Sequence, residues 1–207
     1  MVEITSKNNQ VYKLFQKLQT KKYRDREGLY LIEGENLVAE ALSEGAAIEK
    51  AIVRKDCSSR LEAMIDKIKG DVFVAGEGLF QAVARTETSQ GIVAAVRKAE
   101  VFPDDIASKG VSGNFVILDR LQDPGNIGTI IRTADAAGYD GIIAMKGTAD
   151  VFSPKTVRAA AGSLFRIPVV FMGTEEELVR FIRAAGKKLT AASPVGSRYY
   201  YEDCLLY

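Results

Sequence analysis

Histidine and tryptophan are absent from this 207-residue chain, and only two cysteines, Cys57 and Cys204, are present. Without histidine, catalysis by an imidazole acid or base is excluded, and so are the common histidine-ligated zinc sites. Two cysteines are too few for a disulfide framework or a cysteine-only metal cluster. We therefore expect no metal site.

Long hydrophobic runs and a strong net charge are also lacking. No run of 18 apolar residues occurs, and the N-terminus has no apolar signal-peptide core. We therefore expect no membrane span and a reduced, cytoplasmic location. The 28 lysines and arginines nearly balance the 27 acidic residues, for a net charge of +1. The overall charge thus does not by itself require a nucleic-acid partner.

The charge is uneven, however, because basic residues dominate the first 26 positions. Val11, Leu14, Phe15 and Leu18 share one face of a predicted amphipathic helix of about four turns. Lysines lie on the other flanks of this helix, at Lys13, Lys17, Lys21 and Lys22. This basic surface is either simply solvated or a contact for RNA phosphates, and the pattern alone favours the solvated surface.

Strands and helices alternate through the first half of the chain, which predicts a three-layer α/β domain over residues 1–97. A polar turn is expected at 23–28. Strands are expected at 29–32, 48–53, 72–74 and 92–96, and helices at 35–42, 58–68 and 78–84. Residues 98–113 are charged, contain Pro103 and lack periodicity, which is typical of a linker. A second domain is expected over 114–207.

The second half is organised around residues 114–138. The apolar run 115–118 predicts a buried strand, a polar turn follows, and apolar spacing from Ile127 to Ala137 predicts a helix that Gly138 ends. In open α/β sheets, ligands bind where strands end and helices begin. Polar side chains crowd that edge, among them Asp119, Gln122, Asn126 and Arg132. On spacing alone, a simple helix cap remains an equal alternative.

Further elements follow in the same alternation. Strands are expected at 141–145, 167–171 and 188–192. Ser153 should cap a helix that runs through Ala161 and stops at Gly162, and Thr174 should cap a helix over 175–185. For the tyrosines at 199–201 we expect surface packing rather than base stacking.

Two long motifs carry a resemblance to a known family. Asp123-Pro124-Gly125-Asn126-Ile127-Gly128, followed by Arg132 and the run Thr133 to Gly138, closely resembles the first motif of the SpoU (TrmH-type) RNA 2′-O-ribose methyltransferases of the SPOUT superfamily. The run Phe152 to Val169 is similar to the segment that follows in that family. The first half resembles, more loosely, the L30e-like substrate-binding domain of many members.

This resemblance implies a fold, an activity and partners. The fold would be α/β, with an L30e-like domain followed by a SPOUT domain of the trefoil-knot type. The activity would be S-adenosylmethionine-dependent methylation of a ribose 2′-hydroxyl, on 23S ribosomal RNA rather than transfer RNA. Members of the family dimerise through the knotted domain, so a homodimer is expected.

The resemblance also implies roles for individual residues. Arg132 matches the proposed catalytic arginine, and Asn126 would fix Arg132 or its loop. Asp119 could hold the loop by accepting backbone N–H bonds. RNA would be bound by Gln122, Ser163 and Arg166 together with Asp119 and the four lysines. For Ser163, a structural turn is an equal alternative.

One expected feature is missing from the sequence. In the family, an Asn-Glu-Gly loop and later segments form the knot and hold the cofactor, and these 207 residues contain no Asn-Glu-Gly. We therefore expect a fragment of a longer enzyme, inactive on its own, with an incomplete SPOUT domain and no assignable cofactor-binding residues. The alternative is a non-catalytic RNA-binding protein derived from the family.

Overall fold

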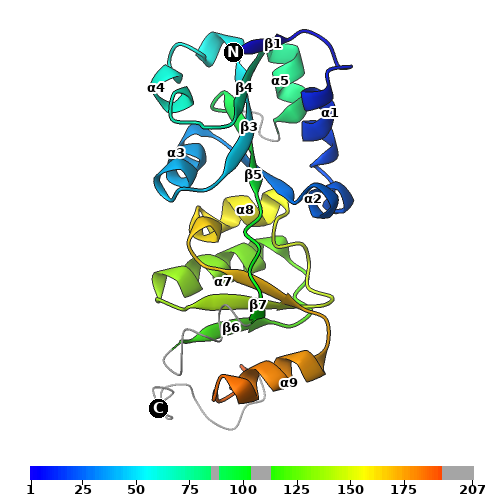
Figure 1. The fold of residues 1–207 in the computed structure, drawn as a ribbon, viewed down its shortest axis with the longest axis vertical. Coiled ribbons are helices and arrows are strands. Elements are labelled where there is room, and N and C mark those ends of the chain that lie inside the picture. Colours follow the sequence, from blue (N-terminus) through cyan, green and yellow to red (C-terminus); the bar gives the residue numbers. More distant parts are fainter. Residues whose placement is uncertain (85–88, 104–112, 193–207) are drawn as a thin grey trace.

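The computed structural model describes residues 1–84, 89–103 and 113–192. The two halves of the chain are stacked one above the other, with a separate β-sheet in each (Figure 1). Residues 2–97 supply a five-stranded sheet and residues 115–172 a three-stranded one. The mixed α/β class predicted from the sequence is confirmed.

The first sheet has the strand order β1-β4-β3-β5-β2. Its strands are β1 (Val2–Ile4), β2 (Leu29–Glu33), β3 (Ile48–Arg54), β4 (Asp71–Ala75) and β5 (Ile92–Arg97). β1, β4 and β3 are parallel, whereas β5 runs antiparallel to both β3 and β2. Four of these strands were predicted. β1 was not, because three residues are too few to show a period-2 pattern.

Helices cover both faces of this sheet, as the three-layer prediction requires (Figure 1). α1 (Gln10–Lys17) and α5 (Glu77–Val83) bury Phe15 and Phe80 against one face. α3 (Glu35–Ser43) and α4 (Glu62–Ile65) bury Val38 and Ile65 against the other.

Two helix predictions in this half are wrong in extent. The predicted four-turn helix is two helices, because α1 ends at Lys17 and α2 spans Lys21–Glu27, where a polar turn was expected. Gly28, with φ of 65°, ends α2 in the left-handed conformation that glycine adopts without strain. Of the helix expected over 58–68, only the four residues of α4 are helical, and a 3₁₀ turn, η1 (Lys55–Cys57), precedes the predicted range.

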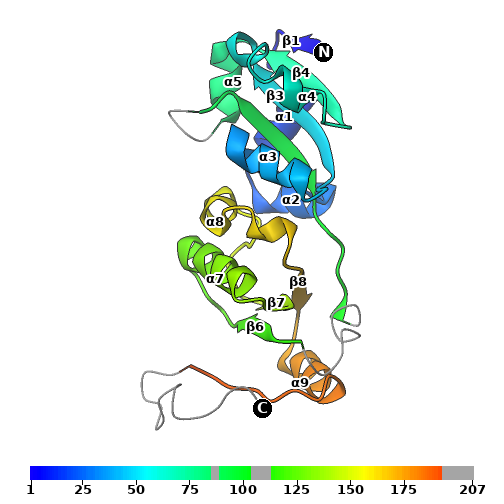
Figure 2. The ribbon, with the colours of Figure 1, turned by 90° about the vertical axis from the view of Figure 1, so that its left-hand side faces the viewer.

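The second sheet is parallel, in the order β6-β7-β8. Its strands are β6 (Phe115–Leu118), β7 (Gly141–Met145) and β8 (Val169–Met172). α7 (Pro124–Ala136), α8 (Pro154–Ala160) and the 3₁₀ turn η2 (Ser163–Phe165) lie on the side of the first half, and α9 (Glu175–Ala184) lies on the other (Figure 2).

The helix caps in this half are confirmed, whereas one strand is not. Ser153 and Thr174 cap α8 and α9 as predicted, and Thr174 forms a complete capping box with Glu177. The strand predicted at 188–192 is wrong, since Leu189 is exposed and none of these residues is in a strand. The tyrosines at 199–201 lie outside the described residues.

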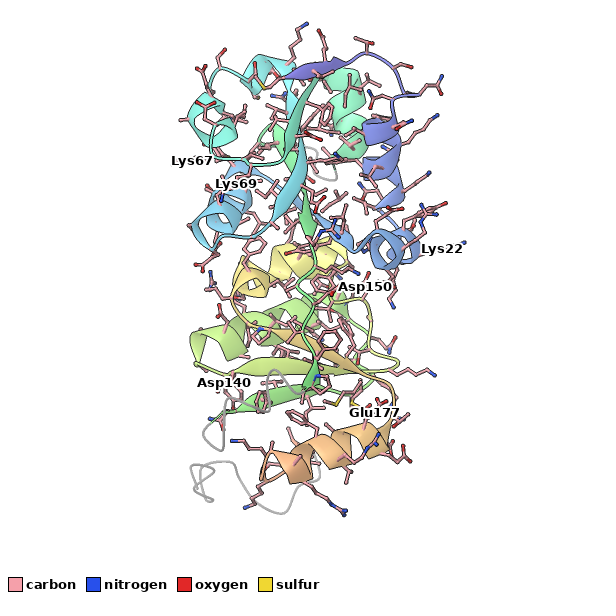
Figure 3. All side chains as sticks on the ribbon, in the orientation of Figure 1. Lys22, Lys67, Lys69, Asp140, Asp150 and Glu177 are labelled. Atoms are coloured by element: carbon pink, nitrogen blue, oxygen red, sulfur yellow. The ribbon has the colours of Figure 1, made fainter. Side chains whose placement is uncertain are left out.

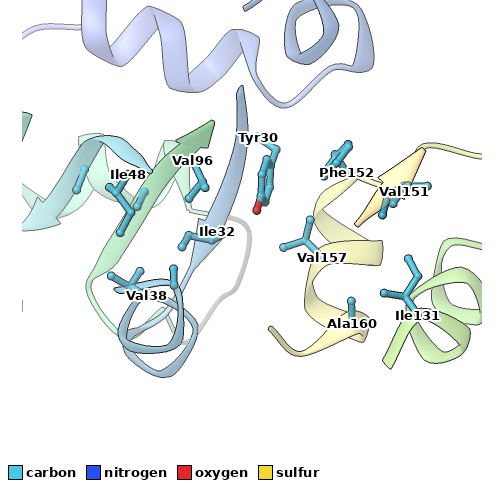
Figure 4. Close-up of a cluster of buried hydrophobic side chains, with 14 of the residues drawn as sticks. Tyr30, Ile32, Val38, Ile48, Val96, Ile131, Val151, Phe152, Val157 and Ala160 are labelled. Atoms are coloured by element: carbon cyan, nitrogen blue, oxygen red, sulfur yellow. The ribbon is translucent and has the colours of Figure 1, made fainter. Parts of the chain in front are cut away.

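One hydrophobic core runs through both halves. It joins Ile32 of β2 and Val38 of α3 to Ile131 of α7 and Val157 of α8. At its centre, the rings of Tyr30 and Phe152 lie 4.9 Å apart (Figure 4). The sheets are therefore separate but the core is shared. The domain boundaries at 97 and 114 stay a prediction, and residues 104–112 of the expected linker lie outside the described residues.

Candidate functional site

The carboxyl ends of β6, β7 and β8 meet at one edge of the second sheet, because the three strands are parallel. Hydrogen bonds hold the loops at this edge together. The Gln122 side-chain amide donates to the carbonyl oxygens of Arg120 at 2.8 Å and Gly147 at 2.7 Å. The Thr148 hydroxyl donates to the Leu118 carbonyl at 2.8 Å. Gln122, predicted to bind substrate, thus fixes the loop after β6 to the loop after β7.

The loop after β6 turns into α7 at Asp123. Its carboxylate accepts a hydrogen bond from the backbone N–H of Asn126 at 2.8 Å, and Pro124 occupies the first turn. This backbone hydrogen bond holds the pKa of Asp123 below its usual value, and the nearby Lys155 ammonium acts in the same direction. Asp123, and not Asn126, is therefore the residue that caps α7. The Asp-Pro pair was the sequence signal for the actual cap.

Arg132 and Asn126 are both exposed on α7. Neither side chain has a hydrogen-bond or ion-pair partner among the described residues, so no such bond joins one to the other. Six residues of helix separate them by about 9 Å along the axis, and their side chains leave the helix in different directions. Arg132 therefore presents a guanidinium with all its donors available, whereas its predicted orientation by Asn126 stays a prediction.

Asp119 accepts two hydrogen bonds from the guanidinium of Arg120, at 3.0 and 2.9 Å. This pairing raises the pKa of Arg120. Arg120 itself has φ of 54°, a left-handed conformation that costs a non-glycine residue free energy and often marks functional sites. The sequence assigned Arg120 no role, because a positive φ at arginine leaves no sequence signal.

The four predicted RNA-binding lysines are all exposed on α1 and α2. Figure 3 shows Lys22, Asp150 and Glu177 along the same side of the molecule. The basic surface of α2 and the carboxyl edge of the second sheet therefore face the same way. A cavity of about 410 Å³ lies between them, with Lys21, Lys98, Lys146 and Phe171 among its lining residues.

Two predicted substrate residues lie elsewhere. Arg166 donates to Asp135 at 2.9 and 2.8 Å and to Glu40 at 2.6 Å, and these carboxylates raise its pKa. Ser163 is 1% exposed at the start of η2. As placed, Arg166 joins α7 to α3 and Ser163 is interior, so their contact with RNA stays a prediction.

Within the described parts of the chain, no helix is long and apolar enough to cross a membrane. Those same parts contain no group of three or more cysteine, aspartate or glutamate side chains that could hold a metal ion.

Comparisons with known proteins match both halves. The model of the SpoU rRNA methylase family matches residues 113–205, and that of the MRM3-like substrate binding domain matches residues 8–94. The 23S rRNA (guanosine(2553)-2′-O)-methyltransferase RlmP of Bacillus subtilis is 42% identical over 172 residues. This match covers 82% of the chain but only 65% of the relative, so the chain spans less than two thirds of that protein.

Solved structures agree with these matches. An rRNA methyltransferase from Sinorhizobium meliloti superposes with a TM-score of 0.77 at 37% identity, over 88% of this chain and 69% of that one. The SpoU methyltransferase AviRb from Streptomyces viridochromogenes, solved in complex with AdoMet, gives a TM-score of 0.77 at 28% identity, over 86% and 68% of the two chains.

Proposed function

Because this chain belongs to the SpoU rRNA methylase family, we propose that it acts as part of an S-adenosylmethionine-dependent RNA 2′-O-ribose methyltransferase. The observation that carries the proposal is Arg132. It occupies the arginine position of the family motif, on a helix that starts at the carboxyl edge of a parallel sheet. Its guanidinium has no partner among the described residues, so it is available to a substrate.

The chemistry explains why an arginine suits this position. A ribose 2′-hydroxyl is a poor nucleophile at neutral pH, and it must be held in line with the methyl group. Guanidinium is too basic to accept a proton readily, but its planar fork binds oxygen pairs in a fixed geometry. We assign Arg132 to clamping the hydroxyl and an RNA phosphate, with the phosphate assisting proton removal. Positioning of this kind can supply about 7–11 kcal/mol of a barrier.

S-adenosylmethionine would supply the methyl group as a sulfonium. The described residues do not form a site for it on their own. Among the described residues, the one buried side-chain polar atom without a partner is the hydroxyl of Ser89. Ser89 precedes β5 in the first half and does not lie at the carboxyl edge of the second sheet. Three lysines and two aspartates line the cavity at that edge, and their net positive charge does not suit a cationic sulfonium. We therefore assign no cofactor-binding residue.

The remaining assignments extend the same proposal. Residues 1–97 would bind RNA, ribosomal rather than transfer RNA, through the exposed lysines of α1 and α2. Residues 114–207 would belong to the methyltransferase domain. We also propose a homodimer and a cytoplasmic location, where ribosomal RNA is found. A non-catalytic RNA-binding protein is the alternative that the test below distinguishes.

The test is methyl transfer by Arg132 variants of the protein in the full length of its reading frame. With radiolabelled S-adenosylmethionine and ribosomal RNA, Arg132→Ala should lose transfer at least about a hundredfold, since the positioning fork is removed. Arg132→Lys should also be impaired, because an ammonium cannot make the bidentate contact. The melting temperature should not change.

Arg183→Ala is the matched control, since Arg183 is also an exposed helical arginine without a partner among the described residues. It should retain full activity. Undiminished turnover by Arg132→Ala would refute the catalytic assignment. RNA binding without any methyl transfer by the unaltered protein would favour the non-catalytic alternative.

A further inference from the structure

The 410 Å³ cavity lies where the two halves of the molecule meet. Lys21 and Asp25 of α2 form one wall, and Lys98 follows β5. The other walls are the carboxyl ends of β7 and β8 with the loop between β7 and α8. The cavity therefore lies between the basic surface of α2 and the carboxyl edge of the second sheet. The helix α7, which carries Arg132, starts at this same edge.

An exposed aromatic ring faces this cavity. Phe171 is 59% exposed, although its neighbours Val170 and Met172 in β8 are buried. Its ring centroid lies 6.2 Å from that of Phe152, which in turn lies 4.9 Å from Tyr30. The row of three rings thus begins in the shared core and ends at an open face. An exposed phenylalanine on such a supported row is suited to stack on another ring.

The charged side chains around Phe171 favour binding of an anion. The two carboxylates of the cavity are already paired, Asp25 with Lys98 at 2.7 Å and with the exposed Lys21 at 3.6 Å, and Asp150 with the buried Arg24. Lys146, exposed and lining the same cavity, has no ion-pair partner among the described residues. The cavity therefore carries a net positive charge, and this charge continues onto Lys22 of α2.

We propose that this cavity binds one unpaired RNA base on the ring of Phe171, with Lys146 and Lys21 holding the adjoining phosphates. The proposal rests on the RNA-directed function proposed above and specifies how that RNA is held. Proteins bind single-stranded RNA by this same combination of an aromatic platform and a basic groove. The site would hold the strand between the basic helices and the carboxyl edge.

A peptide strand added to the edge of β8 fits the observations less well. β8 offers only four residues for pairing, and the charge around it would not select a peptide. A base with its phosphates uses both the ring and the lysines.

The test compares two RNAs that differ by one base. The probe is a single-stranded RNA of about 12 nucleotides with a central 2-aminopurine, and the second RNA has an abasic site at that position. The wild-type chain should quench the 2-aminopurine fluorescence and bind the intact RNA about tenfold more tightly than the abasic one. Phe171→Ala should lose this tenfold preference, and Phe171→Trp should restore it.

Two further variants separate stacking from charge. Lys146→Ala should weaken binding of both RNAs alike and reduce the salt dependence by about one unit of slope. Tyr139→Ala is the matched control, because Tyr139 is also an exposed aromatic residue but precedes β7, at the opposite edge of the sheet. It should bind both RNAs as the wild type does.

Three outcomes would overturn the proposal. If Phe171→Ala retains the preference for the intact RNA, or if the wild type binds both RNAs equally, the base site is refuted while the proposed methyltransferase function stands. If the wild type binds neither RNA, the RNA-directed function of this chain fails as well.

Discussion

Three arginines of the second half differ in whether their guanidinium groups have ion-pair partners. Arg132 is exposed and has no partner among the described residues, whereas Arg120 is paired with Asp119 and Arg166 with Asp135 and Glu40. Both Arg132 and Arg166 were predicted as site residues from their positions in the family motifs. Sequence could not distinguish them, because Glu40, one partner of Arg166, lies 126 positions away in the chain.

Asp123 is the residue whose titration tests the geometry of the site. Its pKa is below the ordinary value of 3.8 because its carboxylate accepts the Asn126 N–H. A carboxyl whose pKa is lower in the folded state stabilises the fold above its unfolded pKa, and this stability is lost as the pH falls through the folded pKa.

We therefore expect the stability of the wild type to fall between about pH 5 and pH 2 by more than that of Asp123→Asn. Asparagine caps a helix equally well but does not titrate. Urea unfolding across this range measures the difference, and a carbon-13 NMR titration of the carboxyl gives the pKa directly. A pKa at or above 3.8 would contradict the cap.

Among the secondary-structure elements, packing of α7 against α8 gives Gly128 of the family motif a structural reason. A Cβ at Gly128 would lie 2.5 Å from the Cβ of Ala159 and 2.6 Å from the carbonyl oxygen of Thr156. The two helices can approach this closely only because Gly128 has no side chain. The resemblance identified Gly128 as part of the family motif, but only the structure shows which atoms of α8 lie against it.

We expect Gly128→Ala to destabilise the fold by about 1–3 kcal/mol, because the backbone of α8 must move away. The control is Gly78→Ala in α5, where a Cβ would meet nothing within 4 Å. There, alanine should stabilise the helix by about 0.5–1 kcal/mol. Thermal unfolding of both variants measures the contrast, and equal effects would mean that the helices do not pack this way.

Elements with a strong local signal were predicted from the sequence. The β-branched runs of β3 and β7 and the caps Ser153 and Thr174 belong to this group. The errors occurred where pairing or packing decides the structure. The stretch 58–68 has the apolar spacing of a helix but forms only α4, and 188–192 has no strand beside it among the described residues.

At the scale of the whole molecule, the junction between the halves depends on contacts that no local pattern predicts. Arg24 is 3% exposed, donates to the Leu18 carbonyl at 2.7 Å and pairs with Asp150 across the junction. The Phe152 N–H donates to the other oxygen of Asp150 at 2.9 Å. The pair therefore fixes α2 of the first half to the loop before α8 in the second.

Replacing Asp150 by alanine should cost about 3–5 kcal/mol, because it leaves a buried guanidinium without a counter-charge. The double variant Arg24→Met, Asp150→Ala should recover much of this loss. Asp25→Ala is the control, since the Asp25 side chain is half exposed, and it should change stability by less than about 1 kcal/mol. A loss for Asp150→Ala as small as that control would mean that the halves are not joined here.

The measurement that tests the central claim most directly is the chemical position of the transferred methyl group. The protein, in the full length of its reading frame, is incubated with ribosomal RNA and methyl-labelled S-adenosylmethionine, and the RNA is then hydrolysed in alkali. A 2′-O-methyl group blocks cleavage of the adjoining phosphodiester, so we predict that the label appears in alkali-resistant dinucleotides and disappears with Arg132→Ala. Label in single nucleotides would place the methyl group on a base and contradict the account.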